Sequence, residues 1–185
     1  MPVTPLIPRA LVHEWSETIG AQAATEQSNL TRIMKDNRRL SRFVEENFES
    51  LDEATRSVAM YLVGVVARIY EKAGGRMRIA SWEQVRAATT KVEGQIGALL
   101  PLDDGFVARC HAVTDRAQPH IVDEAVYALF ERPSRPDEPQ TPANERLKLL
   151  LLMWVANEVC AANWTPPRGF TGDATYTHTP VEDAP

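Results

Sequence analysis

Apolar residues recur every three or four positions along most of this chain, the spacing of one face of an α-helix. The pattern predicts helices over about residues 9–25, 30–49, 53–73, 82–100, 105–131 and 142–164. Almost no segment alternates apolar and polar residues as a strand would. We therefore expect an all-α fold, a bundle of five or six helices.

The segment 53–73 is predicted to be the central helix. Between Val58 and Tyr70, every residue except Arg68 is apolar or small. A helix that is apolar on nearly all sides must be covered on nearly all sides. The other helices should therefore pack around this one.

Several helix ends have local sequence signals. Asp52 is a typical N-cap, and Gly74–Gly75 should end the helix that follows it. Ser81 and Gln84 have the spacing of a capping box, in which each side chain bonds to the backbone N–H of the other residue. Thr141–Pro142 has the pattern of an N-cap followed by a proline in the first turn.

Two helical stretches contain a predicted break or bend. Helical spacing continues through residues 9–51, so one long helix is conceivable, but Ser28–Asn29 offers a cap and favours a break there. Pro119 falls inside the predicted helix 105–131 and should bend it near residues 115–118.

The rest of the chain is predicted to be extended or flexible. Residues 1–8 contain three prolines and should be extended, and residues 9–164 should form a single domain. Within it, residues 132–142 have a proline at every third position, which is typical of polyproline II and could span about 34 Å. Such a linker would let the last helix run parallel to the preceding one. Residues 165–185 should form a flexible tail.

Composition indicates a soluble protein of one domain. The net charge of −5 disfavours non-specific binding to nucleic acid. We expect Cys110 and Cys160 to be small buried residues in a reducing compartment. The N-terminus lacks a signal-peptide pattern, and no apolar run reaches the ~20 residues that cross a bilayer. These features predict a cytoplasmic location without membrane association.

Histidines and carboxylates at helical spacing give candidates for a metal site. His111 and Asp115 are four residues apart, as are His120 and Glu124. Two ligands per turn is how helical bundles build metal sites. However, the Glu-x-x-His motif of di-iron bundles is absent, and Cys110 on the apolar seam would turn His111 away from the core. His111, Asp115, His120 and Glu124 therefore stay candidates, and no cofactor is predicted.

No catalytic motif is present in the sequence. It contains no Gly-x-Ser-x-Gly elbow and no glycine-rich phosphate loop, and no second histidine follows His13 at zinc-protease spacing. The sequence therefore favours a non-enzymatic role.

The polar face of segment 30–49 is basic in its first half and acidic in its second. Its members are Arg32, Lys35, Arg39, Arg42, Glu45, Glu46 and Glu49. Such a face is self-complementary between two antiparallel copies, which favours a homodimer. Its cations are also the best candidate for nucleic-acid binding, although the adjoining carboxylates argue against this.

From the sequence alone, our main hypothesis is a non-enzymatic protein–protein interaction module: an adaptor, an accessory subunit or a self-associating scaffold. The alternative is a helical bundle that binds a small ligand or a metal ion, with a possible enzymatic role. The third hypothesis is a nucleic-acid binder that uses the basic half of the 30–49 face.

Overall fold

The computed structural model describes residues 4–138 and 140–181. Residues 1–3, 139 and 182–185 lie outside it, so our predictions for those parts of the N-terminal segment, linker and tail are not compared. The all-α fold is confirmed, because the described chain is a helical bundle with one two-residue strand pair. The elements are α1 (Arg9–Ala21), α2 (Ala23–Asp36), α3 (Arg38–Glu46), η1 (Phe48–Ser50), α4 (Glu53–Ala73), β1 (Arg76–Met77), α5 (Trp82–Leu99), α6 (Phe106–Ala112), α7 (Pro119–Val126), η2 (Tyr127–Glu131), α8 (Ala143–Asn163) and β2 (Trp164–Thr165).

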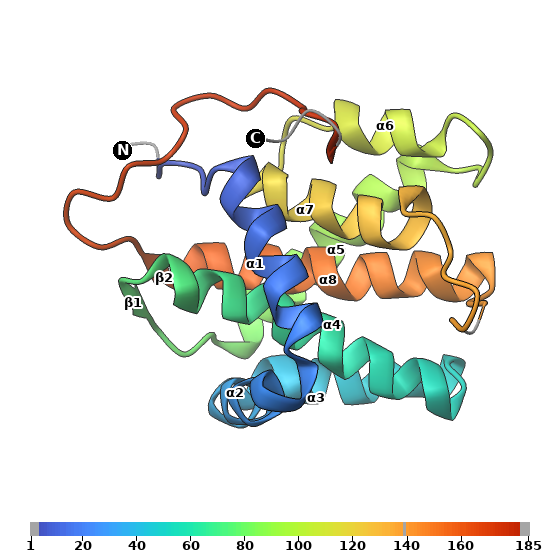
Figure 1. The fold of residues 1–185 in the computed structure, drawn as a ribbon, viewed down its shortest axis with the longest axis horizontal. Helices are drawn as coiled ribbons and strands as arrows, with labels where there is room; N and C mark the ends of the chain where they lie inside the picture. Colours follow the sequence, from blue (N-terminus) through green and yellow to red (C-terminus); the bar gives the residue numbers. More distant parts are fainter. Residues whose placement is uncertain (1–3, 139, 182–185) are drawn as a thin grey trace.

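The helices surround α8, which runs through the middle of the molecule (Figure 1). Helices α7 and α6 lie on one side of it, and α4 lies on the other, with α2 and α3 beyond α4. Helix α5 packs behind α8, and α1 crosses α7 and α4.

The most deeply buried helix is α8 rather than α4. Every residue from Leu149 to Asn157 is buried, whereas the longest fully buried run of α4 is Val63–Ala67. Tyr70 of α4 donates a hydrogen bond to the Asn157 side chain at 2.7 Å, which satisfies two polar groups inside the core. The centre is thus a pair of helices, and Val58 on the first half of α4 is 43% exposed.

Helix α2 crosses α4 at a point of close approach. A Cβ atom on Gly64 would lie 3.4 Å from the Leu30 side chain, so only a small residue fits there comfortably. Beside this crossing, Arg68 of α4 donates to the buried Glu26 of α2 at 2.9 Å. The one charged residue within the apolar stretch of α4 therefore has a partner, as burial of a charge requires.

Most of the predicted caps are confirmed. Asp52 accepts a hydrogen bond from the Thr55 N–H at 2.8 Å. Ser81 and Gln84 form the capping box, with bonds of 2.8 and 3.1 Å. Gly74 ends α4 with φ of 80°. The cap of α8 was wrong by one position, because Pro142 rather than Thr141 precedes the first helical residue.

The predicted break at Ser28–Asn29 is wrong, since both residues lie within α2. The chain leaves helical geometry at Gln22 and again at Asn37, where φ and ψ are −98° and 57°. The Asn37 side chain donates to the Ile33 carbonyl at 2.9 Å and so takes part in ending α2. Gln22 has no side-chain cap, and its break has no local sequence signal.

Pro119 starts a helix rather than bending one. It is the first residue of α7, where its missing N–H costs no helical hydrogen bond. Residues 113–118 separate α7 from α6, so the predicted helix 105–131 is two helices. This break and the one at Asn37 account for the eight α-helices of the described residues, where five or six were predicted.

The proline-rich linker does not carry the chain across the molecule. Helix α7 and helix α8 run antiparallel, and the linker joins ends that lie on the same side (Figure 1). A turn forms where Glu138 N–H donates to the Arg135 carbonyl at 3.1 Å, and Arg132 pairs with Glu138 at 2.5 Å. The parallel arrangement that an extended linker would permit is therefore not adopted.

The predicted flexible tail contacts other parts of the chain at several points. Leu6 and Asp173 exchange two backbone hydrogen bonds of 2.9 Å, which join the N-terminal segment to the tail. The tail then continues to Tyr176 and His178, which contact α6 and α7.

The two cysteines are buried and unpaired, as predicted. Burial raises the pKa of both thiols to about 12. Within the described part of the chain, no helix has the length and apolar character needed to cross a membrane.

Candidate functional site: a histidine–carboxylate cluster

All four histidines of the chain lie beside carboxylates on or next to α7. His13 is 3.1 Å from Glu124, and His120 is 3.2 Å from Asp173. His111 and His178 both face Asp123. Every residue of α7 is buried, so its ionisable side chains need partners from neighbouring segments.

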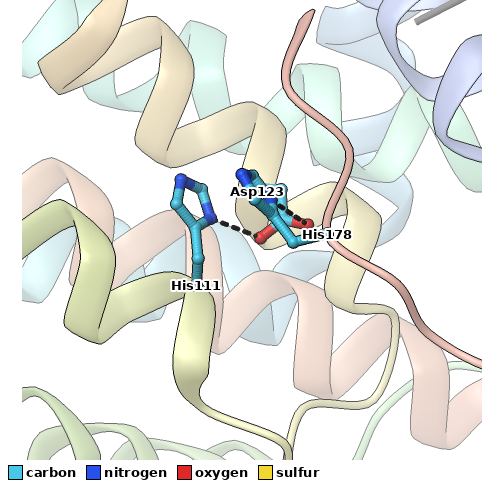
Figure 2. A group of neighbouring side chains, drawn as sticks. All are labelled: His111, Asp123 and His178. Carbon is cyan, nitrogen blue, oxygen red and sulfur yellow. Dashed lines mark hydrogen bonds and ion pairs between the residues drawn. The ribbon is translucent and has the colours of Figure 1, made fainter. Parts of the chain in front are cut away.

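Asp123 is the centre of the cluster, with 1% of its side chain exposed (Figure 2). Its Oδ1 accepts hydrogen bonds from Arg116 at 2.8 Å and lies 2.9 Å from His111 Nδ1. Its Oδ2 accepts a hydrogen bond of 2.8 Å from the Tyr176 hydroxyl and lies 3.6 Å from His178 Nδ1. Four side chains from α6, the 113–118 loop and the tail thus converge on one carboxylate.

The surroundings keep Asp123 ionised. Burial opposes ionisation, but the hydrogen bond with His111 and the charge of Arg116 outweigh it and hold the pKa of Asp123 well below its usual range. For His111, burial lowers the pKa, but the bonds with Asp123 and Glu131 raise it overall. Burial raises the pKa of Tyr176 to about 12, so its hydroxyl stays protonated and can donate.

Glu131 reaches His111 through an unusual turn. The last turn of this helical segment, η2, is a π-helix in which Arg132 N–H donates to the Tyr127 carbonyl at 2.7 Å. Glu131 Oε1 lies 2.6 Å from His111 Nε2. His111 therefore has a carboxylate at each ring nitrogen.

A second group lies on the α1 side of α7. Glu124 accepts a hydrogen bond from Arg9 at 2.6 Å, and both side chains are buried. His13, Glu17 and Glu124 have possible ligand atoms within 4.8 Å of one another. Arg9 thus supplies a cation to Glu124, as Arg116 does to Asp123.

The structure does not bring the four predicted metal candidates together. His111 lies at Asp123, and Glu124 lies at Arg9 and His13. His120 lies next to Asp173, and burial lowers its pKa. Asp115 is 81% exposed and pairs with Lys91 at 3.0 Å. Helical spacing placed His111 with Asp115, but α6 ends at Ala112, so these two residues do not share a helix.

Sequence reasoning missed Asp123 as the central residue and missed Tyr176 and His178 altogether. Asp123 follows His120 at helical spacing, which was a usable signal. The tail residues gave none, because Tyr176 lies 53 residues from Asp123 in the sequence, and such pairing depends on tertiary structure.

The predicted interaction face lies on the other side of the molecule, on α2, α3 and η1. Arg32 pairs with Glu71 at 2.6 Å, Arg42 pairs with Glu46 at 3.0 Å, and Arg39 donates to the Ala80 carbonyl at 2.9 Å. Beside this face, α2, α3 and α4 enclose a groove of about 700 Å³. Its lining includes the apolar side chains Leu30, Met34 and Met60 together with Tyr61, Lys35, Arg38, Arg42 and Glu45.

No protein-family model matches this chain, and neither the search of curated proteins nor the search of solved structures finds a similar one.

Proposed function

We propose that this chain is a non-enzymatic helical interaction module that forms a two-fold dimer through the α2–α3 groove. The observation that carries the proposal is a groove with an apolar floor and a charged rim, in which the cations Lys35, Arg38 and Arg42 are followed by the carboxylate Glu45. Leu30, Met34 and Met60 supply the apolar contact area, and the rim charges set the orientation of the second copy.

The order of charges along α3 supports pairing with an antiparallel copy. At 100° per residue, Arg38, Arg42 and Glu45 fall within about 60° of one another on the helix surface, and all three line the groove. Glu49 continues in the same direction in η1. A two-fold axis near Phe43–Val44 places Arg38 of one copy opposite Glu49 of the other, and Arg42 opposite Glu45.

Several of these charges are free to pair between copies. Among the described residues, Arg38, Glu45 and Glu49 have no ion-pair partner, and all three are exposed. Surface ion pairs each contribute less than about 1 kcal/mol, so the apolar floor must provide most of the affinity. A cytoplasmic location is part of this proposal, because two free cysteines suit a reducing compartment.

A charge-swap experiment tests the dimer. One variant carries Arg38→Glu and Arg42→Glu, and the other carries Glu45→Lys and Glu49→Lys. Each variant alone brings like charges together and should be monomeric, whereas an equimolar mixture should form a heterodimer. Light scattering and native mass spectrometry at micromolar concentration measure both outcomes.

The control is Arg168→Glu, an exposed charge reversal in the tail, which should dimerise like the wild type. A monomeric wild-type protein, or two charge variants that fail to associate when mixed, would overturn the proposal. A gel shift at low salt separates the nucleic-acid alternative, because binding lost in the Arg38→Glu/Arg42→Glu variant of a monomeric chain would favour it.

A further inference from the structure

Two imidazoles and one carboxylate meet at the surface end of the histidine–carboxylate cluster. One ring nitrogen each of His111 and His178 and one carboxylate oxygen of Asp123 lie within 4.8 Å of one another. Figure 2 shows both rings directed at Asp123, His111 from α6 and His178 from the tail. The two rings are stacked, with their centroids 3.7 Å apart.

Both ring nitrogens of His111 face a carboxylate oxygen. Nε2 lies 2.6 Å from Glu131 Oε1, and the tautomer of the ring decides which of its nitrogens carries a proton. Nδ1 lies 2.9 Å from Asp123 Oδ1, and a metal ion bound by Nδ1 would replace the proton of this hydrogen bond. A carboxylate on the distal nitrogen is also the usual support for a metal-binding histidine.

His178 provides a second, independent observation in favour of a metal site. Its Nδ1 is buried and has no hydrogen-bond partner among the described residues, although it lies 3.6 Å from Asp123 Oδ2. Ligand atoms on a tetrahedral zinc ion lie about 3.4 Å apart, given bonds of about 2.0–2.1 Å. The separations of 2.9 and 3.6 Å, each to a different oxygen of Asp123, are on either side of that value. The stacked rings must rotate relative to each other to direct both nitrogens at one ion.

We propose that His111, Asp123 and His178 bind a divalent transition-metal ion, of which Zn²⁺ is the representative. Two imidazoles and a carboxylate suit zinc and iron(II), whereas Ca²⁺ and Mg²⁺ prefer oxygen ligands alone. His178 is 32% exposed, so the ion reaches the site from solvent and keeps a position for water. The bound ion ties the C-terminal tail to α6 and α7.

Arg116 lowers the expected affinity for a metal ion but leaves one oxygen of Asp123 accessible to it. Its guanidinium occupies Asp123 Oδ1, and its positive charge repels a cation. Oδ2 stays available, because its bond from the neutral Tyr176 hydroxyl carries no net charge. We therefore expect micromolar rather than nanomolar binding.

Titration of the full-length, chelator-treated protein tests the site. Calorimetry with Zn²⁺ and absorption spectroscopy with Co²⁺ should show one ion per chain. His178→Gln should weaken binding at least tenfold, because it removes a ligand from an exposed tail and leaves the core intact. Glu131→Gln should weaken it less, through the orientation of His111.

His13→Gln is the matched control, since it removes another histidine that faces a buried carboxylate on α7. Its affinity should equal that of the wild type. Absence of stoichiometric binding to the wild-type chain, or equal binding by His178→Gln, would overturn the proposal. Circular dichroism of each variant confirms that the helical fold is kept. The dimer proposal is independent of this result.

Discussion

Val65 lies in the middle of α4, with 5% of its surface exposed. Val65→Asp would bury a carboxylate without a partner, which we expect to destabilise the fold by about 3 kcal/mol or more. Val58→Asp is the matched control on the same helix, because Val58 is 43% exposed, and it should cost less than about 1 kcal/mol. Urea denaturation measures both. Equal stability of the two variants would show that Val65 is not in the core.

Two glycines should respond in opposite directions to the same substitution. Gly75 has φ of 88°, and a Cβ atom there would lie 2.2 Å from the Thr165 carbonyl oxygen. Gly75→Ala should therefore destabilise the protein by more than about 1 kcal/mol. Gly94 lies within α5 with open space around it, so Gly94→Ala should stabilise by about 0.5–1 kcal/mol. Thermal denaturation distinguishes these signs, and a shared sign would contradict the prediction.

The contact between α2 and α4 should depend on pH. The hydrogen bond from Arg68 lowers the pKa of Glu26 against the opposing effect of burial. A carboxyl group with a lower pKa in the folded chain adds stability at neutral pH, and this stability is lost as pH falls through the folded pKa. Glu26→Gln should therefore be less stable than the wild type at pH 7, and the difference should shrink below about pH 4.

Glu71→Gln is the control for this contact. Glu71 pairs with the same Arg68 but is exposed, so its loss should have a smaller effect at either pH. Chemical denaturation at the two pH values gives the comparison. A Glu26→Gln difference that stays constant with pH would exclude the ion pair as its cause.

The elements that were predicted correctly are those with local signals. Asp52, Ser81 and Gly74 end or start helices through bonds to neighbouring residues, so the sequence alone reveals them. The break at Gln22 has no such signal; both helices contact α4, but α1 also packs against α7 and α2 against α3. Pro119 was noticed, but a proline within a helix and a proline at its start give the same local pattern.

The candidate site could be predicted only in part, because its residues come from distant segments. His111 was selected for its spacing to Asp115, whereas its actual partners are Asp123 and Glu131. Similarly, Arg68 stood out as the charged residue of an apolar stretch, but nothing in the sequence paired it with Glu26. Long-range pairing of buried charges follows from tertiary packing, which periodicity does not encode.

At the scale of the whole molecule, the two backbone hydrogen bonds between Leu6 and Asp173 hold the N-terminal segment and the C-terminal tail together. A Cβ atom on Gly172 would lie 2.3 Å from the Leu6 carbonyl oxygen, so Gly172→Ala should detach both segments together. Hydrogen exchange of the Leu6 and Asp173 amides should accelerate by a similar factor. Thr171→Ala, an exposed neighbouring change, should leave both amides protected. Acceleration at only one amide would show that the two segments open independently.

Because Cys110 and Cys160 are buried and free, the alkylation of each thiol measures local unfolding of the helix that carries it. Alkylating reagents attack the thiolate, and a thiol with a pKa of about 12 is almost entirely protonated at neutral pH. Cys110 lies on the short peripheral α6, whereas Cys160 lies on α8 at the centre. Iodoacetamide therefore labels the first when the edge of the bundle loosens and the second only when its middle comes apart.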